Sequence, residues 1–340
     1  MADRPSLELG YFLSSEEHPP ARLVAHARLA QTAGFRTVMI SDHLQPWTPS
    51  QGESAFVWTV IGAIAQAAPG LEVGTGVSAL VHRVPPVVLA HAAATASLLL
   101  EGRFFLGLGT GERLNEQVTG QRWPRAGERR QILEEALPLV RKLLAGKTVN
   151  HRGPHVTLER ARLHSVPASV PPIFVAAGGK RAAEVAGELA DGLIGVAPVA
   201  AVVEAFDAAG GADKPRFAQL KLCWARDRDE AVATVRRWFP TEGLPPQLLS
   251  ELATPEEFAA ATELVSDDRL ADAVVCGPDP GPVVAAVQRL VATGFTRVYL
   301  HQVGPDQAGF LRFLREELLP ALGADLASVP VGPAAPAAGR

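Results

Sequence analysis

The sequence predicts an α/β fold: a (β/α)8 TIM barrel whose insertion segments form a lid at the C-terminal face. Eight short apolar runs of β type alternate along the chain with segments of helical periodicity. The chain has 340 residues and 47% hydrophobic content, enough to bury a barrel core. Eight strand–helix units in this order are more typical of a closed barrel than of an open doubly wound sheet.

The predicted barrel strands are short apolar runs separated by helical or turn-forming segments. They are Leu7–Tyr11, Thr37–Ile40, Leu71–Val77, Phe104–Gly107, Ile173–Ala176, Leu193–Val196, Phe217–Cys223 and Val298–His301. Residues 21–33 and 128–144 predict amphipathic helices, because their apolar residues recur every three or four positions. Gly34, Gly187 and Gly294 stand where we expect helices to end before the next strand.

Two segments are longer than the minimal repeat requires. Residues 149–171 predict a short hairpin or extended excursion before the fifth strand. Residues 239–268 contain two helical pieces and predict a lid over the barrel mouth. We therefore expect a single barrel domain over residues 1–322, followed by a flexible Ala/Pro/Gly-rich tail over residues 323–340.

Charge and cysteine content indicate the environment of the protein. A net charge of −4 without a polybasic run argues against nucleic-acid and anionic-membrane partners. No apolar stretch reaches membrane-spanning length, and the N-terminus lacks the apolar region of a signal peptide. The two cysteines, Cys223 and Cys276, are far apart and form no CxxC motif, which is typical of a reducing compartment. We expect a cytoplasmic protein.

Polar residues with chemical potential follow several predicted strands. Glu16 follows the first strand, His43 and Trp47 the second, and Glu112 and Asn115 the fourth. Each could have a structural role as a turn cap, packing residue or helix-dipole partner. In a barrel, however, these loops converge at one mouth, where active sites lie. A histidine beside carboxylates is suited to general acid–base catalysis, so we predict an active site there.

Glycine-rich segments follow the fourth and fifth strands, at residues 107–111 and 176–180. They could serve only as tight turns, but they also allow backbone amides to approach a flat ring or a phosphate. The chain lacks a Rossmann fingerprint, a Walker loop, a nucleophile elbow and an HExxH motif. His151 and His155 are separated by Gly153 and Pro154, which prevent a shared helix, so we expect no metal site.

Five strings carry a family resemblance that extends over residues 7–319. They are S-D-H-L-Q-P-W (41–47), G-T-G-V (74–77), F-L-G-L-G-T-G-E-R-L-N-E (105–116), F-V-A-A-G-G (174–179) and A-D-G (190–192). Together they resemble the luciferase-like monooxygenase superfamily. Within it they are most similar to the deazaflavin-dependent branch typified by the coenzyme F420-dependent glucose-6-phosphate dehydrogenases.

The resemblance implies a binding site for coenzyme F420, with FMN as the alternative cofactor. The residues expected to line the deazaflavin and its phosphate tail are Asp42, Gly76, Val77, Thr110, Gly111, Asn115, Ala176, Ala177, Gly178 and Gly179. The resemblance also implies a cis peptide bond between Gly76 and Val77, and a homodimer.

The resemblance further implies an oxidoreductase that acts on a CH–OH group and transfers a hydride to or from deazaflavin C5. His43 would be the base for the substrate hydroxyl, with Glu16 assisting it. Trp47 would pack at the substrate, and Glu112 would protonate the ring nitrogen. Two proton-transfer groups on opposite sides of the reacting pair suit hydride loss from an alcohol. The same groups would run the reverse reaction, so the physiological direction stays open.

The chain departs from the family where those enzymes hold a substrate phosphate with two lysines and an arginine. The aligned positions here are Val199, Ala260 and Ala286. Losing three charge-assisted contacts would remove most of the affinity for a dianion. We therefore expect glucose 6-phosphate to be a poor substrate, and the actual small-molecule substrate to be a neutral one. It would be an unphosphorylated sugar, a secondary alcohol or ketone, or a tailoring intermediate.

Three alternatives remain at this point. The first is an FMN-dependent luciferase-like monooxygenase that uses dioxygen. The second is an F420-dependent sugar-6-phosphate dehydrogenase with an altered phosphate site. The third is a non-catalytic deazaflavin- or sugar-binding barrel, although a mere binder has no need for His43, Glu16 and Glu112 together.

Overall fold

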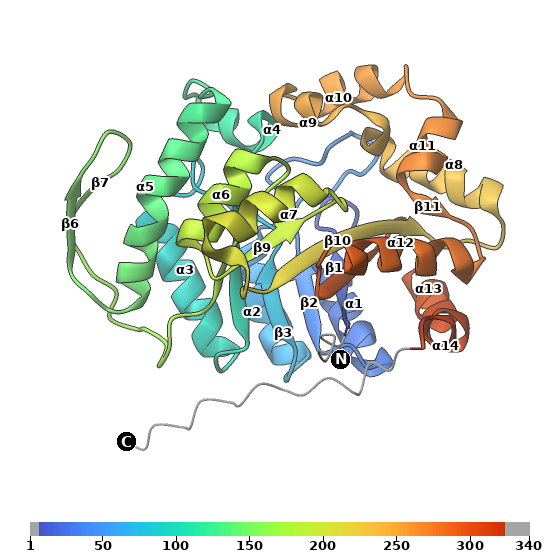
Figure 1. Ribbon diagram of the computed structural model, residues 1–340, viewed down its shortest axis with the longest axis horizontal. Coiled ribbons are helices and arrows are strands. Elements are labelled where there is room, and N and C mark those ends of the chain that lie inside the picture. The colour runs from blue at the N-terminus through green and yellow to red at the C-terminus, as the bar shows by residue number, and fades with distance from the viewer. Residues whose placement is uncertain (1–6, 324–340) are drawn as a thin grey trace.

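The computed structural model describes residues 7–323, and within this range eight parallel strands close into a barrel (Figure 1). They are β1 (Glu8–Leu13), β2 (Thr37–Ile40), β3 (Glu72–Thr75), β5 (Phe104–Gly109), β8 (Ile173–Ala176), β9 (Gly192–Gly195), β10 (Arg216–Cys223) and β12 (Arg297–Gln302). Neighbours follow chain order, and pairing of β12 with β1 closes the ring. The predicted TIM barrel and all eight predicted strands are confirmed, with ends shifted by at most two residues.

Helices that follow the strands cover the outside of the barrel. They are α1 (Pro20–Ala33), α2 (Val57–Ala67), α3 (Pro86–Leu99), α5 (Ala126–Leu144), α6 (Lys180–Leu189), α7 (Ala200–Phe206) with η2 (Asp207–Gly211), α8 (Arg228–Trp238), α12 (Pro280–Ala292), and α13 (Gln307–Phe313) with η4 (Leu314–Leu318) and α14 (Leu319–Leu322). Gly34 and Gly294, with φ of 107° and 105°, end helices as predicted. The prediction for Gly187 was wrong, since α6 continues past it to Leu189. Gly187 is instead a close-packing residue: a Cβ there would lie 2.5 Å from the Phe206 carbonyl oxygen.

Both segments that exceed the minimal repeat contain additional elements. The first contains the antiparallel hairpin of β6 (Val149–Arg152) and β7 (Thr157–Ala161), which lies outside α5 in Figure 1. The second contains η3 (Pro240–Gly243), α9 (Pro246–Glu251) and α10 (Pro255–Thr262), followed by α11 (Asp267–Ala273) and β11 (Val275–Cys276). Figure 1 shows α9 and α10 lying across one end of the barrel. The remaining short elements are β4 (Ser78–Ala79), α4 (Arg113–Glu116) and η1 (Gln117–Thr119).

Large side chains fill the inside of the barrel, so the interior is packed and does not form an open channel. The buried cluster there consists of Phe12, Met39, Phe105, Phe174, Ile194, Phe217 and Tyr299. Glycines on neighbouring strands make room for these rings. Gly74 pairs in register with Phe105, and a Cβ at Gly74 would lie 1.9 Å from that ring. Gly10 faces Tyr299 in the same way.

The predicted boundary at residue 322 stays a prediction, because residues 324–340 of the expected tail lie outside the described residues. Among the helices of residues 7–323, none is both long enough and apolar enough to cross a membrane.

Candidate active site

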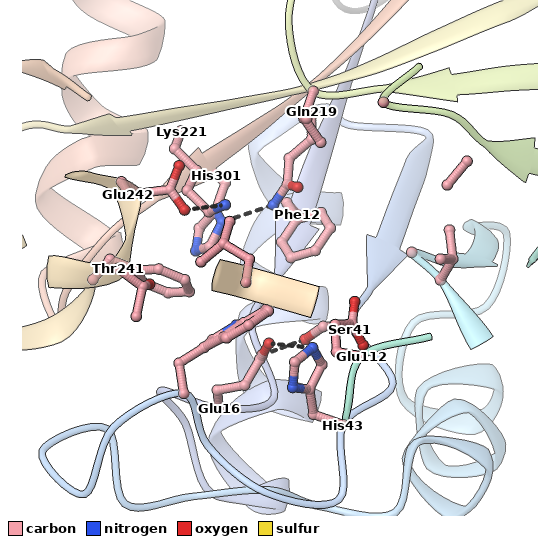
Figure 2. A pocket seen from close by; sticks show the side chains of 18 of the residues that line it. Phe12, Glu16, Ser41, His43, Glu112, Gln219, Lys221, Thr241, Glu242 and His301 are labelled. Atoms are coloured by element: carbon pink, nitrogen blue, oxygen red, sulfur yellow. Dashed lines mark hydrogen bonds and ion pairs between the residues drawn. The ribbon is translucent and has the colours of Figure 1, made fainter. Parts of the chain in front are cut away.

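A cavity of about 450 Å³ lies between the barrel and the lid, and Figure 2 shows its lining. Many of the predicted site residues meet there. They are Glu16, His43, Trp47, Gly76, Val77, Gly111, Glu112, Ala176 and Gly178. An adjoining cavity of about 190 Å³ shares part of this wall and adds Thr110 and Ala177. The lid segment closes the cavity with Thr241, Glu242, Pro246, Leu249 and Ser250. Barrel topology thus brings together residues that are far apart in the sequence.

Three predicted cofactor residues, Asp42, Asn115 and Gly179, are not among the residues lining either cavity. The Asp42 carboxylate is buried and already has partners. It accepts a 2.5 Å hydrogen bond from Ser78 Oγ and pairs with Arg83 Nη2 at 2.9 Å. In this position Asp42 holds the segment that contains Ser78 and Arg83. Direct contact between Asp42 and a cofactor stays a prediction.

Glu16 and His43 form a buried pair at the cavity wall. His43 Nε2 lies 3.4 Å from Glu16 Oε1, and the other carboxylate oxygen accepts a 2.5 Å hydrogen bond from Ser41 Oγ. Burial acts to raise the pKa of Glu16. Attraction to the His43 ring in its protonated form and the hydrogen bond from Ser41 outweigh burial, so the net pKa of Glu16 lies below the usual range. Glu16 therefore carries a carboxylate that can stabilise a protonated imidazole.

The Asn115 side chain contacts His43 on the Nδ1 side of the ring. Its Oδ1 accepts hydrogen bonds from the backbone amides of Leu44 at 2.8 Å and Gln45 at 3.2 Å. The orientation of the amide is thereby fixed, so Nδ2 is directed at His43 Nδ1, 3.0 Å away, and at Glu112 Oε2, 3.4 Å away. His43 Nδ1 also lies 3.2 Å from the Gln45 carbonyl oxygen. One side chain thus links two of the predicted catalytic groups.

Trp47 joins the site to the lid. Its ring lies 4.9 Å from that of His43, and it packs edge to face against Phe258 of α10 at 5.2 Å. The Trp47 backbone amide donates to Gln51 Oε1 at 2.7 Å, which fixes the loop after β2. The Trp47 indole therefore lies between His43, the candidate base, and helix α10 of the lid.

Sequence reasoning missed a second polar wall across the cavity from His43 (Figure 2). Gln219 Nε2 lies 2.9 Å from His301 Nδ1, and His301 Nε2 lies 2.9 Å from Glu17 Oε2. His301 also stacks on Phe12, with ring centroids 4.8 Å apart. A signal was present: polar residues within and at the end of strongly apolar strands of a barrel point to its interior.

Lys221 also lines this wall and is a basic residue that the comparison of Val199, Ala260 and Ala286 did not include. Those three positions lie outside the barrel strands, whereas Lys221 lies on β10 itself. Its Nζ pairs with Glu242 Oε1 of the lid at 2.7 Å. The cavity wall therefore carries the Lys221 ammonium group, whose charge is already neutralised by the Glu242 carboxylate.

The opposite edge of the cavity has the shape needed for a flat ring with a phosphate tail. A Cβ at Gly109 would lie 2.7 Å from Val77 Cγ2, so only a glycine keeps this face flat. At Gly178 and Gly179 an added Cβ would enter open space just before helix α6. Backbone amides at the start of a ten-residue helix favour an anion. The predicted cis peptide bond between Gly76 and Val77 is confirmed. A deazaflavin therefore fits these residues.

Sequence comparison shows the family. Residues 7–297 match the profile of the luciferase-like monooxygenases, and the chain belongs to this family. Its relatives indicate the branch of the family to which it is most similar. The chain is 34% identical to the F420-dependent glucose-6-phosphate dehydrogenase of Mycolicibacterium fortuitum, over 93% of this chain and 98% of that one. It is 35% identical to the F420-dependent hydroxymycolic acid dehydrogenase of Mycobacterium tuberculosis, over 92% of this chain and 88% of that one.

A solved structure agrees with these relatives. It is an F420-dependent secondary alcohol dehydrogenase in complex with an F420-acetone adduct, and it is 25% identical to this chain. The TM-score is 0.86, and the match covers 93% of this chain and 99% of the other. The resemblance to the F420-dependent branch of the family is confirmed by these three proteins.

Proposed function

We propose that the protein is a coenzyme F420-dependent dehydrogenase or reductase that acts on an uncharged substrate bearing a hydroxyl or carbonyl group. The observation that carries this proposal is the cavity itself, which is lined both by the Glu16–His43 pair and by the glycine-rich loops. The named relatives support the cofactor, and they use three different alcohol substrates. The FMN-dependent monooxygenase alternative has no comparable support among these relatives.

When bound, F420 supplies a hydride acceptor or donor at C5 of its deazaflavin ring. Val77, Gly111, Ala176 and Gly178 would hold the ring and its attached chain at the flat edge of the cavity. Glu112 lies at the same edge and would supply a proton to the ring nitrogen. Pairing a proton donor with the hydride transfer avoids an uncompensated negative charge in a closed site.

His43 would take the substrate hydroxyl proton at Nε2. Nε2 can accept this proton when the neutral ring carries its hydrogen on Nδ1 and donates it to the Gln45 carbonyl oxygen; Asn115 Nδ2 then donates to Glu112 Oε2 and not to His43. The imidazolium that results would face the Glu16 carboxylate 3.4 Å away, and that carboxylate is kept ionised by Ser41 and by His43 itself. Trp47 would pack at the substrate and keep water from this side of the site. The same groups serve carbonyl reduction in reverse.

Replacing His43 by Ala tests this assignment. We expect turnover with F420 to fall by about 10²–10⁴-fold, the usual contribution of a positioned acid–base group. Because the His43 ring is placed on the substrate side, the affinity for F420, measured by fluorescence titration, should stay within about twofold of wild type. Loss of F420 binding with unchanged turnover of the bound fraction would reverse the assignment and make His43 a cofactor-binding residue.

We further propose that the protein works as a cytoplasmic homodimer. Phe56 before α2 and Val88, Leu98 and Leu99 on α3 are exposed apolar side chains, which a second copy would cover. The two cysteines are free, in keeping with a reducing compartment.

A further inference from the structure

The ion pair between Lys221 and Glu242 joins a barrel strand to the lid at the cavity wall. Lys221 Nζ lies 2.7 Å from Glu242 Oε1 and 5.1 Å from the centroid of the Phe239 ring. The side chains are only 19% and 22% exposed. Salt screens a pair in this position less than it screens a pair on the open surface. Figure 2 places the pair across the cavity from Glu16 and His43.

Glu242 is held in place by the backbone around it. It lies within η3, and the preceding residue, Thr241, is buried. The following residue, Gly243, accepts a 3.0 Å hydrogen bond from Arg269 Nε through its carbonyl oxygen. A Cβ at Gly243 would lie 2.2 Å from Val265, so this turn is closely packed. The carboxylate is therefore fixed beside Lys221 by the fold of the lid.

The charges of the cavity lining oppose an anionic substrate. Three acidic side chains line it, those of Glu16, Glu112 and Glu242. Among the described residues of this lining, Lys221 is the one lysine or arginine. A phosphate or carboxylate entering the cavity would meet the like charges of Glu16 and Glu242, and the ammonium that could offset them is already paired. A hydroxyl group can instead exchange hydrogen bonds with the pair without adding charge.

We propose that Glu242 is a specificity-determining residue: by pairing with Lys221 it keeps the cation from anionic substrates and so selects uncharged, hydroxyl-bearing ones. The proposal rests on the function proposed above and identifies the residue that sets the substrate class. Glu242 acts from the lid, so the choice between neutral and anionic substrates is made by the insertion and not by the barrel.

The test is titration of the purified protein with glucose 6-phosphate, followed by calorimetry. Wild type should show no binding up to millimolar concentration, whereas Glu242→Gln should bind at least about tenfold more tightly because Lys221 is released. Glu242→Asp keeps the charge and should still reject the ligand. The double variant Lys221→Met/Glu242→Gln should lose the gain. Glu256→Gln is the matched control, since it removes one exposed carboxylate from the same lid segment without touching the cavity.

No gain in Glu242→Gln, or an equal gain in Glu256→Gln, would overturn the proposal. Micromolar binding of glucose 6-phosphate by wild type would overturn it too, and that measurement needs no variant to fold. Titration of the same preparations with F420 separates the two proposals. If F420 does not bind, the proposed function fails, while the glucose 6-phosphate series still reports on the ion pair.

Discussion

At the scale of single residues, His18 and His26 set a response to acid that is separate from the active site. Their rings meet edge to face with centroids 4.6 Å apart, and both are buried. Burial lowers the pKa of each to about 4, from an ordinary value of 6.5. Between these values the unfolded chain binds more protons than the folded chain. Stability should therefore fall as the pH falls from 6.5 toward 4.

His26→Leu is expected to reduce this loss. Between pH 7 and pH 5 the free energy of unfolding of the variant should fall by about 1–2 kcal/mol less than that of wild type, because one buried titrating ring is gone. Urea titrations at the two pH values measure the difference. His91→Gln, an exposed position on α3, is the control and should behave as wild type. An identical fall in wild type and His26→Leu would show that this ring does not carry the effect.

The sequence identified the residues at strand ends but missed those inside strands. Glu16, His43, Trp47 and Glu112 follow strands directly, so barrel topology alone places them at one mouth. Lys221 lies within β10, where alternation puts it inside the barrel, but its pairing with the lid depends on a long-range fold. The loops aligned with the family's phosphate site contain no sign of a basic residue on a barrel strand.

At the scale of elements, matching of glycines to aromatic rings fixes how adjacent strands pack inside the barrel. Gly74 on β3 lies beside Phe105 on β5, and the ring occupies the space where a side chain would stand. This relation could not be read from the sequence, because it depends on strand register. The periodicity of α5 and the two insertions could be read, since each depends on local pattern alone.

Gly74→Ala should destabilise the barrel by about 1–3 kcal/mol, since its methyl group would overlap the Phe105 ring and force the strands apart. The matched control is Gly62→Ala in the middle of α2, where the nearest atom to an added Cβ is Leu99 Cδ1 at 3.8 Å. That change should be neutral or stabilise by about 0.5–1 kcal/mol. Chemical denaturation of both variants provides the comparison. Equal stabilities would show that the strands adapt to a larger residue at Gly74.

At the scale of the whole molecule, the proposed function places the chemistry in the barrel and the choice of substrate in the lid. The strand-end loops hold Glu16 and His43 on one wall and the glycine-lined edge beside Glu112. The lid places Glu242 against Lys221 and packs Phe258 against Trp47.

The most direct measurement of the central claim is an anaerobic hydride-transfer assay. Oxidised F420 is mixed with the protein and a panel of secondary alcohols and free sugars, and loss of the deazaflavin absorbance is followed. The proposed function predicts bleaching with at least one neutral substrate, none with glucose 6-phosphate, and no requirement for dioxygen. Absence of bleaching across the panel, together with incorporation of an oxygen atom into a panel substrate in a parallel aerobic assay with reduced FMN, would contradict it and indicate the monooxygenase alternative.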